Sequence, residues 1–327
     1  DVYEEGIASV CTVRDFSMIF DSYSQFEESL ITAQLQQQAD AEAAAAAGGA
    51  ADALQEELDM RVARIERLME RRPELLSSVL LRQNPHAVHE WLKRAGLFEG
   101  EPAKVIHTYA TAVKTVDPNR ALGKLQQLWL AFAAFYEKHN DLKNARVILK
   151  KATQVPYKTV DDLAAVWSGW AEMEIRHKKY KEALAVLAEA TTIPPAAKRS
   201  KDKEMAGPVQ GRLYKHTKLW SFYADLQENL SGFEATRATY EKIFELRIVT
   251  PQLVLSYASF LEEHKHFELA FQAYEKGVAI FKHPHVMQIW NPYLAKFVAR
   301  YKGTKVEKAS RSRAMPTPWP PLTPEAP

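Results

Sequence analysis

An internal repeat of 38 residues constrains the fold of this chain more than any other feature. Three tryptophans recur at that interval, and each is followed 27 residues later by a proline: Trp91 and Pro118, Trp129 and Pro156, Trp167 and Pro194. A period between about 20 and 50 residues indicates a stacked array, in which each supersecondary element pair buries its apolar face only against its neighbours. The repeat therefore bears on both the fold and the kind of function to expect.

Each repeat contains two amphipathic helical segments. In the copy that begins at Trp129, bulky aromatic residues recur at i, i+3 and i+7, and smaller apolar residues recur from Ala145 at i, i+4 and i+7. Large side chains on the first helix then lie over alanines on the second, which predicts a closely packed antiparallel pair. Asn140 and Asp141 interrupt the first helix, and the closing proline ends the second. Because no segment shows sustained alternation of period two, we predict an all-α fold.

About seven repeats are expected, some of them incomplete. Later copies begin at Trp220, Val254 and Trp290, and an earlier one begins at Phe20, with its second helix expected at about residues 58–72. The predicted structural anchors are the recurrent large and small residues of the two helices: Trp91, Trp129, Trp167, Trp220, Trp290, Ala145 and Ala183. Their helical spacing favours a core role over stacking on nucleic-acid bases.

The repeat array is predicted to comprise residues 1–32 and 54–315, with two insertions and a tail. Residues 33–53 are rich in Gln and Ala and offer little bulky apolar surface, so we interpret them as a flexible loop. Residues 195–211 are interpreted as a basic surface loop. Residues 316–327 carry six prolines, which forbid helix and predict a disordered tail. Residues 1–10 read as the second helix of a repeat, so we expect further sequence upstream.

Composition and charge argue against a membrane span and against general attraction of polyanions such as nucleic acids. The chain is 46% apolar and 26% charged, and no apolar run approaches the roughly 18 residues that a membrane span needs. A single cysteine, Cys11, excludes an internal disulfide framework and fits a reducing compartment. The net charge is only +2. Local contact with RNA or an acidic partner stays open for four loop side chains: Lys198, Arg199, Lys201 and Lys203.

No catalytic or metal-binding constellation emerges from the sequence. His86 and His89 lie at i, i+3, but no cysteine or carboxylate completes a ligand set beside them. Asp161 and Asp162 precede an apolar run and suit the start of a helix. Phosphate-binding glycine loops, GxSxG and HExxH are absent. We therefore expect no enzyme activity, no cofactor and no metal.

Five charged residues leave two interpretations open. They are expected either to form ion pairs between helices or to remain solvated: Glu137, Glu174, Glu262, Arg146 and Arg237.

The repeat pattern also resembles a known repeat family. A first helix that reads Trp-x-x-aromatic followed by Glu, and a second that reads Ala-Arg-x-Ile-Leu-x-x-Ala at residues 145–152, resemble half-a-TPR (HAT) repeats of RNA-processing proteins. Longer stretches are similar to the SYF-type pre-mRNA-splicing factors, the XPA-binding protein family of animals: residues 13–16, 20–29, 78–86, 145–149, 160–164 and 260–265. The resemblance spans about residues 1–309 outside the two insertions.

The resemblance implies a right-handed α-solenoid of HAT/TPR-like antiparallel helix pairs. It also implies a nuclear, non-enzymatic scaffold of pre-mRNA splicing, in the spliceosome-associated NineTeen complex and the intron-binding complex. The implied partners are a crooked-neck-type HAT protein, an aquarius-type helicase and other members of the NineTeen complex. The alternative is an RNA-binding HAT-repeat protein of mRNA 3′-end or ribosomal RNA processing. A lengthwise basic stripe would favour RNA, whereas a mixed surface with apolar patches would favour protein partners.

Overall fold

Helices account for nearly all regular structure in the described part of the chain. The computed structural model describes residues 2–43, 50–193 and 209–301. Within these ranges the elements are α-helices and one 3₁₀ helix, Leu213–Lys215, beside a single isolated bridge between Ala87 and Leu122. The predicted all-α fold is therefore confirmed.

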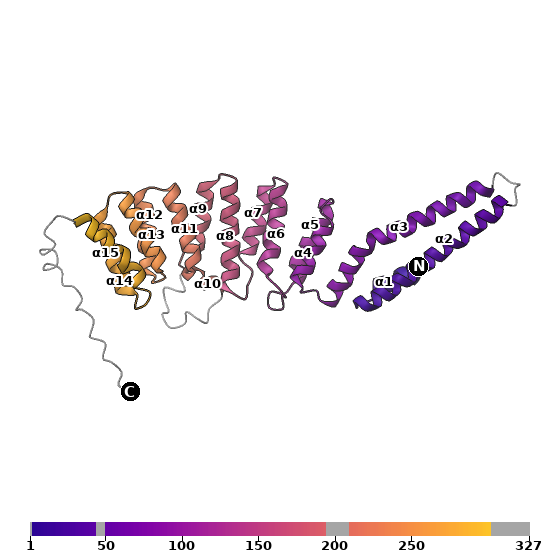
Figure 1. Ribbon diagram of the computed structural model, residues 1–327, viewed down its shortest axis with the longest axis horizontal. Helices are drawn as coiled ribbons and strands as arrows, with labels where there is room; N and C mark the ends of the chain where they lie inside the picture. The colour runs from indigo at the N-terminus through magenta and orange to yellow at the C-terminus, as the bar shows by residue number, and fades with distance from the viewer. Residues whose placement is uncertain (1, 44–49, 194–208, 302–327) are drawn as a thin grey trace, which may run out of the picture. The chain divides into compact units, whose positions relative to one another are not determined.

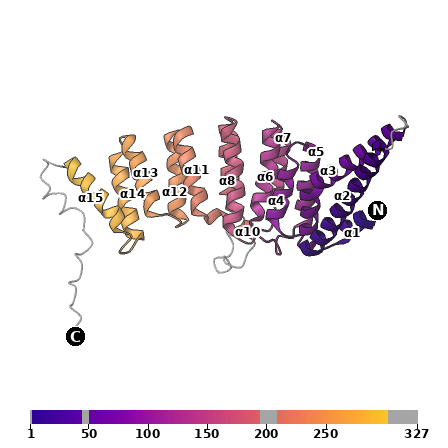
Figure 2. The ribbon, with the colours of Figure 1, turned by 45° about the vertical axis from the view of Figure 1, so that its right-hand side comes forward.

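Most helices form antiparallel pairs that coincide with the sequence repeat (Figures 1 and 2). The pairs are α2 (Val13–Ala43) with α3 (Ala50–Gln83), α4 (Val88–Leu97) with α5 (Pro102–Thr115), α6 (Leu125–Lys138) with α7 (Leu142–Ala152), α8 (Val160–Arg176) with α9 (Tyr180–Ala190), α11 (Thr217–Leu230) with α12 (Phe233–Glu245), and α13 (Pro251–Glu263) with α14 (Phe267–Ile280). Three further helices pack on these pairs: α1 (Val2–Ser9) on α2, α10 (Val209–Arg212) on α8, and α15 (Met287–Tyr301) on α13 and α14.

The chain divides into two compact units, Asp1–Tyr214 and Lys215–Pro327. In the first unit the first helices of successive repeats, α4, α6 and α8, pack on one another, and α5 and α7 each pack on the next first helix. In the second unit α15 packs on the α13–α14 pair in the same manner. The predicted stacking of TPR-like helix pairs is thus confirmed within each unit.

Local sequence explains where these helices begin and end. Asp141 caps α7 by accepting a hydrogen bond from the amide of Asn144 at 3.1 Å, and Thr159 caps α8 by accepting one from the amide three residues later. Beyond the last residues of α6 and α8, Asn140 and Lys178 adopt left-handed backbone conformations with φ of 59° and 57°. A left-handed residue just past a helix turns the chain back, so the second helix returns alongside the first.

The structure corrects the predicted loop at residues 33–53. Residues 33–43 continue α2 and residues 50–53 begin α3, so the described part of this segment is helical. Ala, Gln and Glu are strong helix formers, and their propensity sustains the helix without bulky apolar side chains. The two helices also touch through Gln38 and Gln55, whose amide Nε2 and Oε1 atoms are 2.9 Å apart.

Three sequence-based expectations fall largely on residues that the structure does not describe. Residues 209–211 of the predicted basic loop belong to α10, whereas residues 195–208 lie outside the described part. The same holds for residues 302–315 of the predicted array and for the predicted tail at 316–327.

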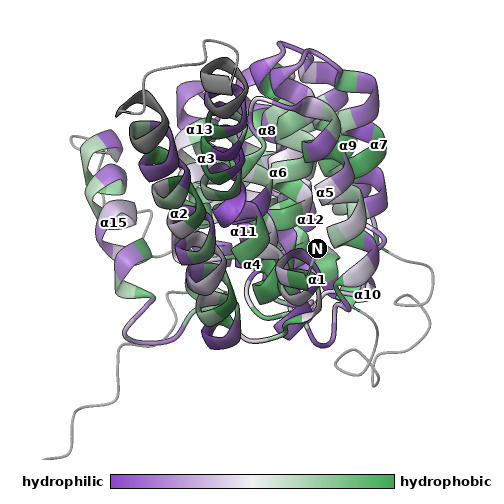
Figure 3. Cartoon of the chain, turned by 90° about the vertical axis from the view of Figure 1, so that its right-hand side faces the viewer, coloured by the Kyte–Doolittle hydropathy of each residue, from purple (hydrophilic) through white to green (hydrophobic). Residues whose placement is uncertain are grey.

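Buried side chains follow the helical period of the repeat. Ala145, Leu163 and Ala183 are fully buried, as are Val254 and Ile289 in the second unit. Figure 3 shows hydrophilic and hydrophobic residues alternating around the turns of the individual helices. Each helix thus buries one face against its neighbours and presents the other to solvent.

Candidate functional site

The predicted tryptophan anchors lie on the first helices of their repeats. Four of them are buried: Trp91, Trp129, Trp167 and Trp220. Trp290, on α15, is half-buried. Trp167 stacks on Trp170 with ring centroids 5.7 Å apart and planes inclined by 17°. Ala145 and Ala183 on the second helices are fully buried. Large and small residues are therefore placed where close helix packing needs them, and the buried rings offer no face to a nucleic-acid base.

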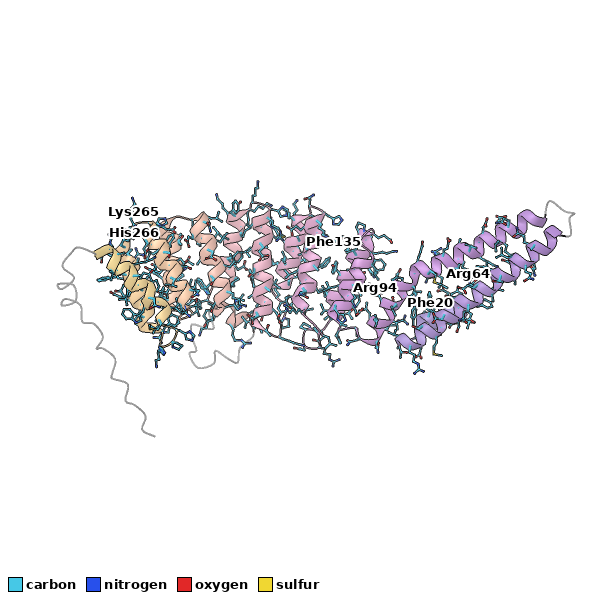
Figure 4. The ribbon with its side chains drawn as sticks, viewed as in Figure 1. Phe20, Arg64, Arg94, Phe135, Lys265 and His266 are labelled. Atoms are coloured by element: carbon cyan, nitrogen blue, oxygen red, sulfur yellow. The ribbon has the colours of Figure 1, made fainter. Side chains whose placement is uncertain are left out.

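Aromatic stacks also join successive repeats. Tyr109 on α5 stacks on Phe132 on α6 with centroids 5.1 Å apart, and Phe135 of α6, labelled in Figure 4, lies 6.4 Å from the same tyrosine. In the second unit Tyr240 on α12 stacks on Tyr257 on α13 at 4.6 Å. Burial raises the pKa of Tyr257 to about 12. These phenols are neutral packing groups at physiological pH.

Glu174 is a buried carboxylate held by the preceding repeat. Its side chain is 2% exposed and accepts two hydrogen bonds of 2.6 Å from the guanidinium of Arg146 on α7, and a third from Trp170 at 3.3 Å. Burial alone would raise the pKa of Glu174, but the hydrogen bonds from Arg146 and Trp170 outweigh burial and hold the pKa below its usual value. The residue is a satisfied structural ion.

Glu137 makes a second ion pair across the same joint, the boundary between the α6–α7 and α8–α9 pairs. It accepts hydrogen bonds of 2.9 and 2.8 Å from Arg176 at the end of α8, and the Nε2 atom of His177 lies 3.1 Å from its Oε1. The Arg176 guanidinium lowers the pKa of Glu137, with a smaller contribution from His177. The sequence pattern did not single out Arg176 or His177. Arg176 nevertheless follows Trp167 by nine residues, just as Lys138 follows Trp129.

The two remaining candidates form different kinds of ion pair. Glu262 on α13 pairs with Lys296 on α15 at 2.6 Å, between helices of neighbouring repeats. Arg237 instead pairs with Glu241 at 2.9 Å within α12. Among the five charged residues singled out from the sequence, Arg237 is thus the one whose ion pair stays within its own helix.

An acidic groove of about 440 Å³ lies between α11 and α13 in the second unit. Asp225 and Glu228 line it on one side, with Ser256 and Ser259 on the other. Burial raises the pKa of Glu228, and the nearby charge of Glu263 raises it further. The carboxylates attract cations and accept hydrogen bonds, and the serine hydroxyls both donate and accept them.

The histidines considered as metal ligands make other contacts. The Nδ1 atom of His86 accepts a hydrogen bond from the amide of Asp117 at 3.2 Å, and the Nε2 atom of His89 lies 2.9 Å from Glu90. Among the described residues, no group of three or more His, Cys, Asp or Glu side chains is arranged to hold a metal ion. No helix in the described ranges has both the length and the apolar character to cross a membrane.

The predicted contact residues of the basic loop have no described position. Lys198, Arg199, Lys201 and Lys203 all fall within the residues outside the described ranges. Their contact with RNA or protein stays a prediction.

Two family profiles together match almost the whole chain. Residues 1–116 match the profile described as "Pre-mRNA-splicing factor SYF1 middle HAT repeat". Residues 118–313 match the one described as "Pre-mRNA-splicing factor Syf1/CRNKL1 C-terminal HAT repeat". The boundary between the two profiles falls just after α5.

Curated relatives show the same similarity across animals and an amoeba. The chain is 53% identical over 309 residues to pre-mRNA-splicing factor SYF1 of Homo sapiens. The aligned residues make up 94% of this chain and 35% of the relative. It is 48% identical to the Drosophila melanogaster syf1 homolog over 309 residues, with coverages of 94% and 34%. It is 43% identical to SYF1 of Dictyostelium discoideum over 319 residues, with coverages of 94% and 35%. The chain thus spans about a third of the length of these relatives.

Proposed function

Because this chain belongs to the SYF1 family of pre-mRNA-splicing factors, as its resemblance predicts, we propose that it acts in pre-mRNA splicing as a non-enzymatic scaffold. Its helix pairs would hold spliceosomal proteins of the NineTeen and intron-binding complexes together in the nucleus. The proposed partners are a crooked-neck-type HAT protein, an aquarius-type helicase and other NineTeen complex members. The observation that carries the proposal is the match of both halves of the chain to HAT-repeat profiles of splicing factors.

The surface of the first unit supports protein partners. Exposed apolar side chains stand among charged ones on several helices, such as Leu97 on α4, Val147 on α7 and Tyr180 on α9. Mixed surfaces of this kind suit protein interfaces. The buried tryptophans leave little aromatic area for base stacking, and a net charge of +2 gives no strong field for a polyanion.

The absence of an enzymatic role is part of the same proposal. Buried or half-buried acids such as Glu174 and Glu137 are taken up in ion pairs with arginines of neighbouring helices. Neither has a nucleophile or an unpaired base beside it, so their lowered pKa values reflect structural pairing. The relatives carry the name of a splicing factor, and that name states no reaction.

Affinity purification from nuclear extract tests the scaffold proposal. The tagged chain is expected to recover crooked-neck-type and aquarius-type proteins above the level recovered by an unrelated tagged helical-repeat protein. A chain that folds but recovers no spliceosomal protein above that control would refute the proposal.

A binding assay with single-stranded RNA tests the alternative, an RNA-binding protein of 3′-end or ribosomal RNA processing. We expect weak binding without sequence preference that falls steeply as salt rises, because only a few phosphates are neutralised. Replacing Lys198, Arg199, Lys201 and Lys203 with alanine should remove most of this binding and leave recovery of spliceosomal proteins intact. Tight, sequence-selective RNA binding together with no recovered spliceosomal protein would favour the alternative.

A further inference from the structure

A groove of about 650 Å³ opens between α3 and α5 in the first unit, with α4 at its floor. Both α3 and α5 pack on α4, and Figure 1 shows α3 tilted away from α5. Its apolar lining includes Leu81 from α3, Phe98 after α4 and Ala103 from α5. The volume falls in the range of cavities that accept ligands or several side chains of a peptide.

Positive charge dominates the polar lining of this α3–α5 groove. Arg82, Arg94 and Lys104 line it together with His107, and Glu74 is the one carboxylate among its lining residues. Arg82 is held in place by hydrogen bonds to the carbonyls of Ile7, Ala8 and Val10 beside α1. The lining thus carries more cations than carboxylates, and Lys104 is paired at 2.9 Å with the exposed carboxylate of Glu101 just outside it.

Arg94 is the least solvated of these cations. Its side chain is 20% exposed, its Nη1 donates to the hydroxyl of Ser78 at 2.7 Å, and its Nη2 lies 4.0 Å from Glu74. Figure 4 labels Arg94 on α4. Burial lowers the pKa of its guanidinium, which the single carboxylate at 4.0 Å does not offset. An incoming carboxylate would give this partly desolvated charge a closer partner.

The aromatic rings of the groove are covered, which argues against a nucleic-acid ligand. Arg94 and Lys104 lie over the ring of Phe98, at 5.6 and 5.4 Å from its centroid. Trp91 is buried, and its Nε1 donates to the carbonyl of Pro85 at 2.9 Å. Single-stranded nucleic acids need open ring faces for stacking, whereas a peptide needs apolar contact and ion pairing.

We propose that the α3–α5 groove binds a short acidic segment of a partner protein, whose apolar side chains contact Leu81 and Ala103 while its carboxylates pair with Arg94 and Lys104. The inference rests on the proposed scaffold function and gives that scaffold one docking site of defined chemistry. It differs from the acidic α11–α13 groove, which would attract segments of opposite charge.

Peptide-phage selection on the purified full chain tests the proposal without nuclear extract. Selected sequences are expected to combine Asp or Glu with Leu, Ile or Phe. A fluorescein-labelled selected peptide, measured by fluorescence anisotropy, should bind the doubly substituted Lys104→Glu, His107→Glu chain at least about tenfold more weakly. Both replaced side chains are exposed on α5, and Lys114→Glu on the same helix, outside the groove, is the matched control and should change affinity less than about twofold.

Two further variants keep the test decisive if the charge reversal disturbs the fold. Thr111→Trp fills the groove without changing its charge and should also abolish peptide binding. A benzophenone amino acid at Ala103, which lines the groove, should cross-link the peptide, whereas the same group at exposed Ala185 on α9 should not.

Three results would overturn the proposal: selected peptides without acidic residues, equal binding to the wild-type and charge-reversed chains, or cross-linking from both positions. Binding of a labelled oligouridine that the charge reversal removes, with no peptide selected, would assign the groove to RNA instead. Because recovery of spliceosomal proteins from extract is measured separately, failure of the groove proposal is distinguishable from failure of the scaffold proposal.

Discussion

Arg146 and Glu174 join two successive repeats through paired hydrogen bonds, Nε to Oε1 and Nη2 to Oε2, each 2.6 Å long. The arginine belongs to the second helix of one repeat and the glutamate to the first helix of the next. The carboxylate is almost completely buried, while the guanidinium reaches solvent with a third of its side chain. A buried carboxylate in this position depends on its partner, because no water can replace the missing charge.

Arg146→Ala should therefore destabilise the first unit by about 3 kcal/mol, since it leaves Glu174 buried without its cation. Guanidinium denaturation monitored by circular dichroism measures the change. The control is Lys138→Ala, which removes a 3.5 Å pair with Glu99 whose side chains are 73% and 80% exposed. That loss should be below about 1 kcal/mol. Equal effects of the two variants would contradict a structural role for the buried pair.

Trp167→Ala should cost about 3 to 5 kcal/mol, because it empties a buried site beside Trp170. In an array stabilised by neighbours, the loss should fall first on α8, α9 and the helices that contact them. Hydrogen exchange read by mass spectrometry locates the effect. A uniform loss of protection along both units would show that the repeats do not behave as a nearest-neighbour array.

Gly277→Ala on α14 should destabilise the second unit by about 1 to 3 kcal/mol through overpacking. The added Cβ would lie 2.7 Å from Cγ1 of Val254, a β-branched and fully buried neighbour that has no free rotamer to adopt. The matched substitution is Gly169→Ala on α8, where the close atom is a terminal methyl of half-buried Leu130 at 2.6 Å.

Leu130 is free to rotate away, and alanine favours helix by up to about 1 kcal/mol over glycine. The Gly169 variant should therefore change the free energy of unfolding by less than the Gly277 variant. Thermal unfolding of the two variants measures both changes. A larger loss of stability for Gly169→Ala than for Gly277→Ala would show that the space around the added Cβ does not determine the effect.

Glu137 should make stability fall on acidification. Its folded-state pKa lies below the unfolded value near 4.5 because Arg176 and His177 hydrogen-bond to the charged form. This contribution is fully present above about pH 4.5 and is lost as pH falls through the lower folded-state pKa. Denaturation midpoints measured at neutral pH and near pH 3.5 should drop less in Glu137→Gln than in the parent chain. Identical pH slopes would exclude Glu137 as a contributor.

Glu228 should act with the opposite sign. Burial and Glu263 raise its pKa above the unfolded value, so its charge opposes folding at neutral pH and its protonation stabilises the fold as pH falls. Glu228→Gln should stabilise the second unit at pH 7, and the gain should shrink as pH falls through the raised pKa. A variant less stable than the parent at pH 7 would show that the charged form is needed, for example through its 3.4 Å contact with Tyr240.

Helices and their pairing were accessible from the sequence because burial imposes a period on it. The offsets that relate Trp129 to Ala145, and Trp167 to Ala183, coincide with pairs of buried positions on adjacent helices. Asn140 marks the end of α6 because it adopts the left-handed turn that an asparagine tolerates. The helix at residues 33–43 and 50–53 does not follow from the apolar pattern, because intrinsic helix propensity rather than packing surface sustains α2 and α3 there.

The sequence does not show which charged residues pair across the boundary between two repeats. Arg146 and Glu174 are 28 residues apart, and Arg176 and Glu137 are 39 apart, so their pairing depends on how one helix pair stacks on the next. The α3–α5 groove depends likewise on the divergence of two helices from α4. Sequence spacing fixes which face of a helix is buried, and leaves the geometry between repeats undefined.

The ion pairs of Glu137 and Glu174 also determine where the first unit resists bending. Both anchor α8 to the preceding pair, α6 and α7, so tilting the repeats apart there must stretch several hydrogen bonds shorter than 3 Å. Between the α4–α5 and α6–α7 pairs, the Lys138–Glu99 bridge is longer and open to solvent. We therefore expect an applied load to deflect the α5–α6 joint before the α7–α8 joint, so that stiffness differs from one repeat boundary to the next.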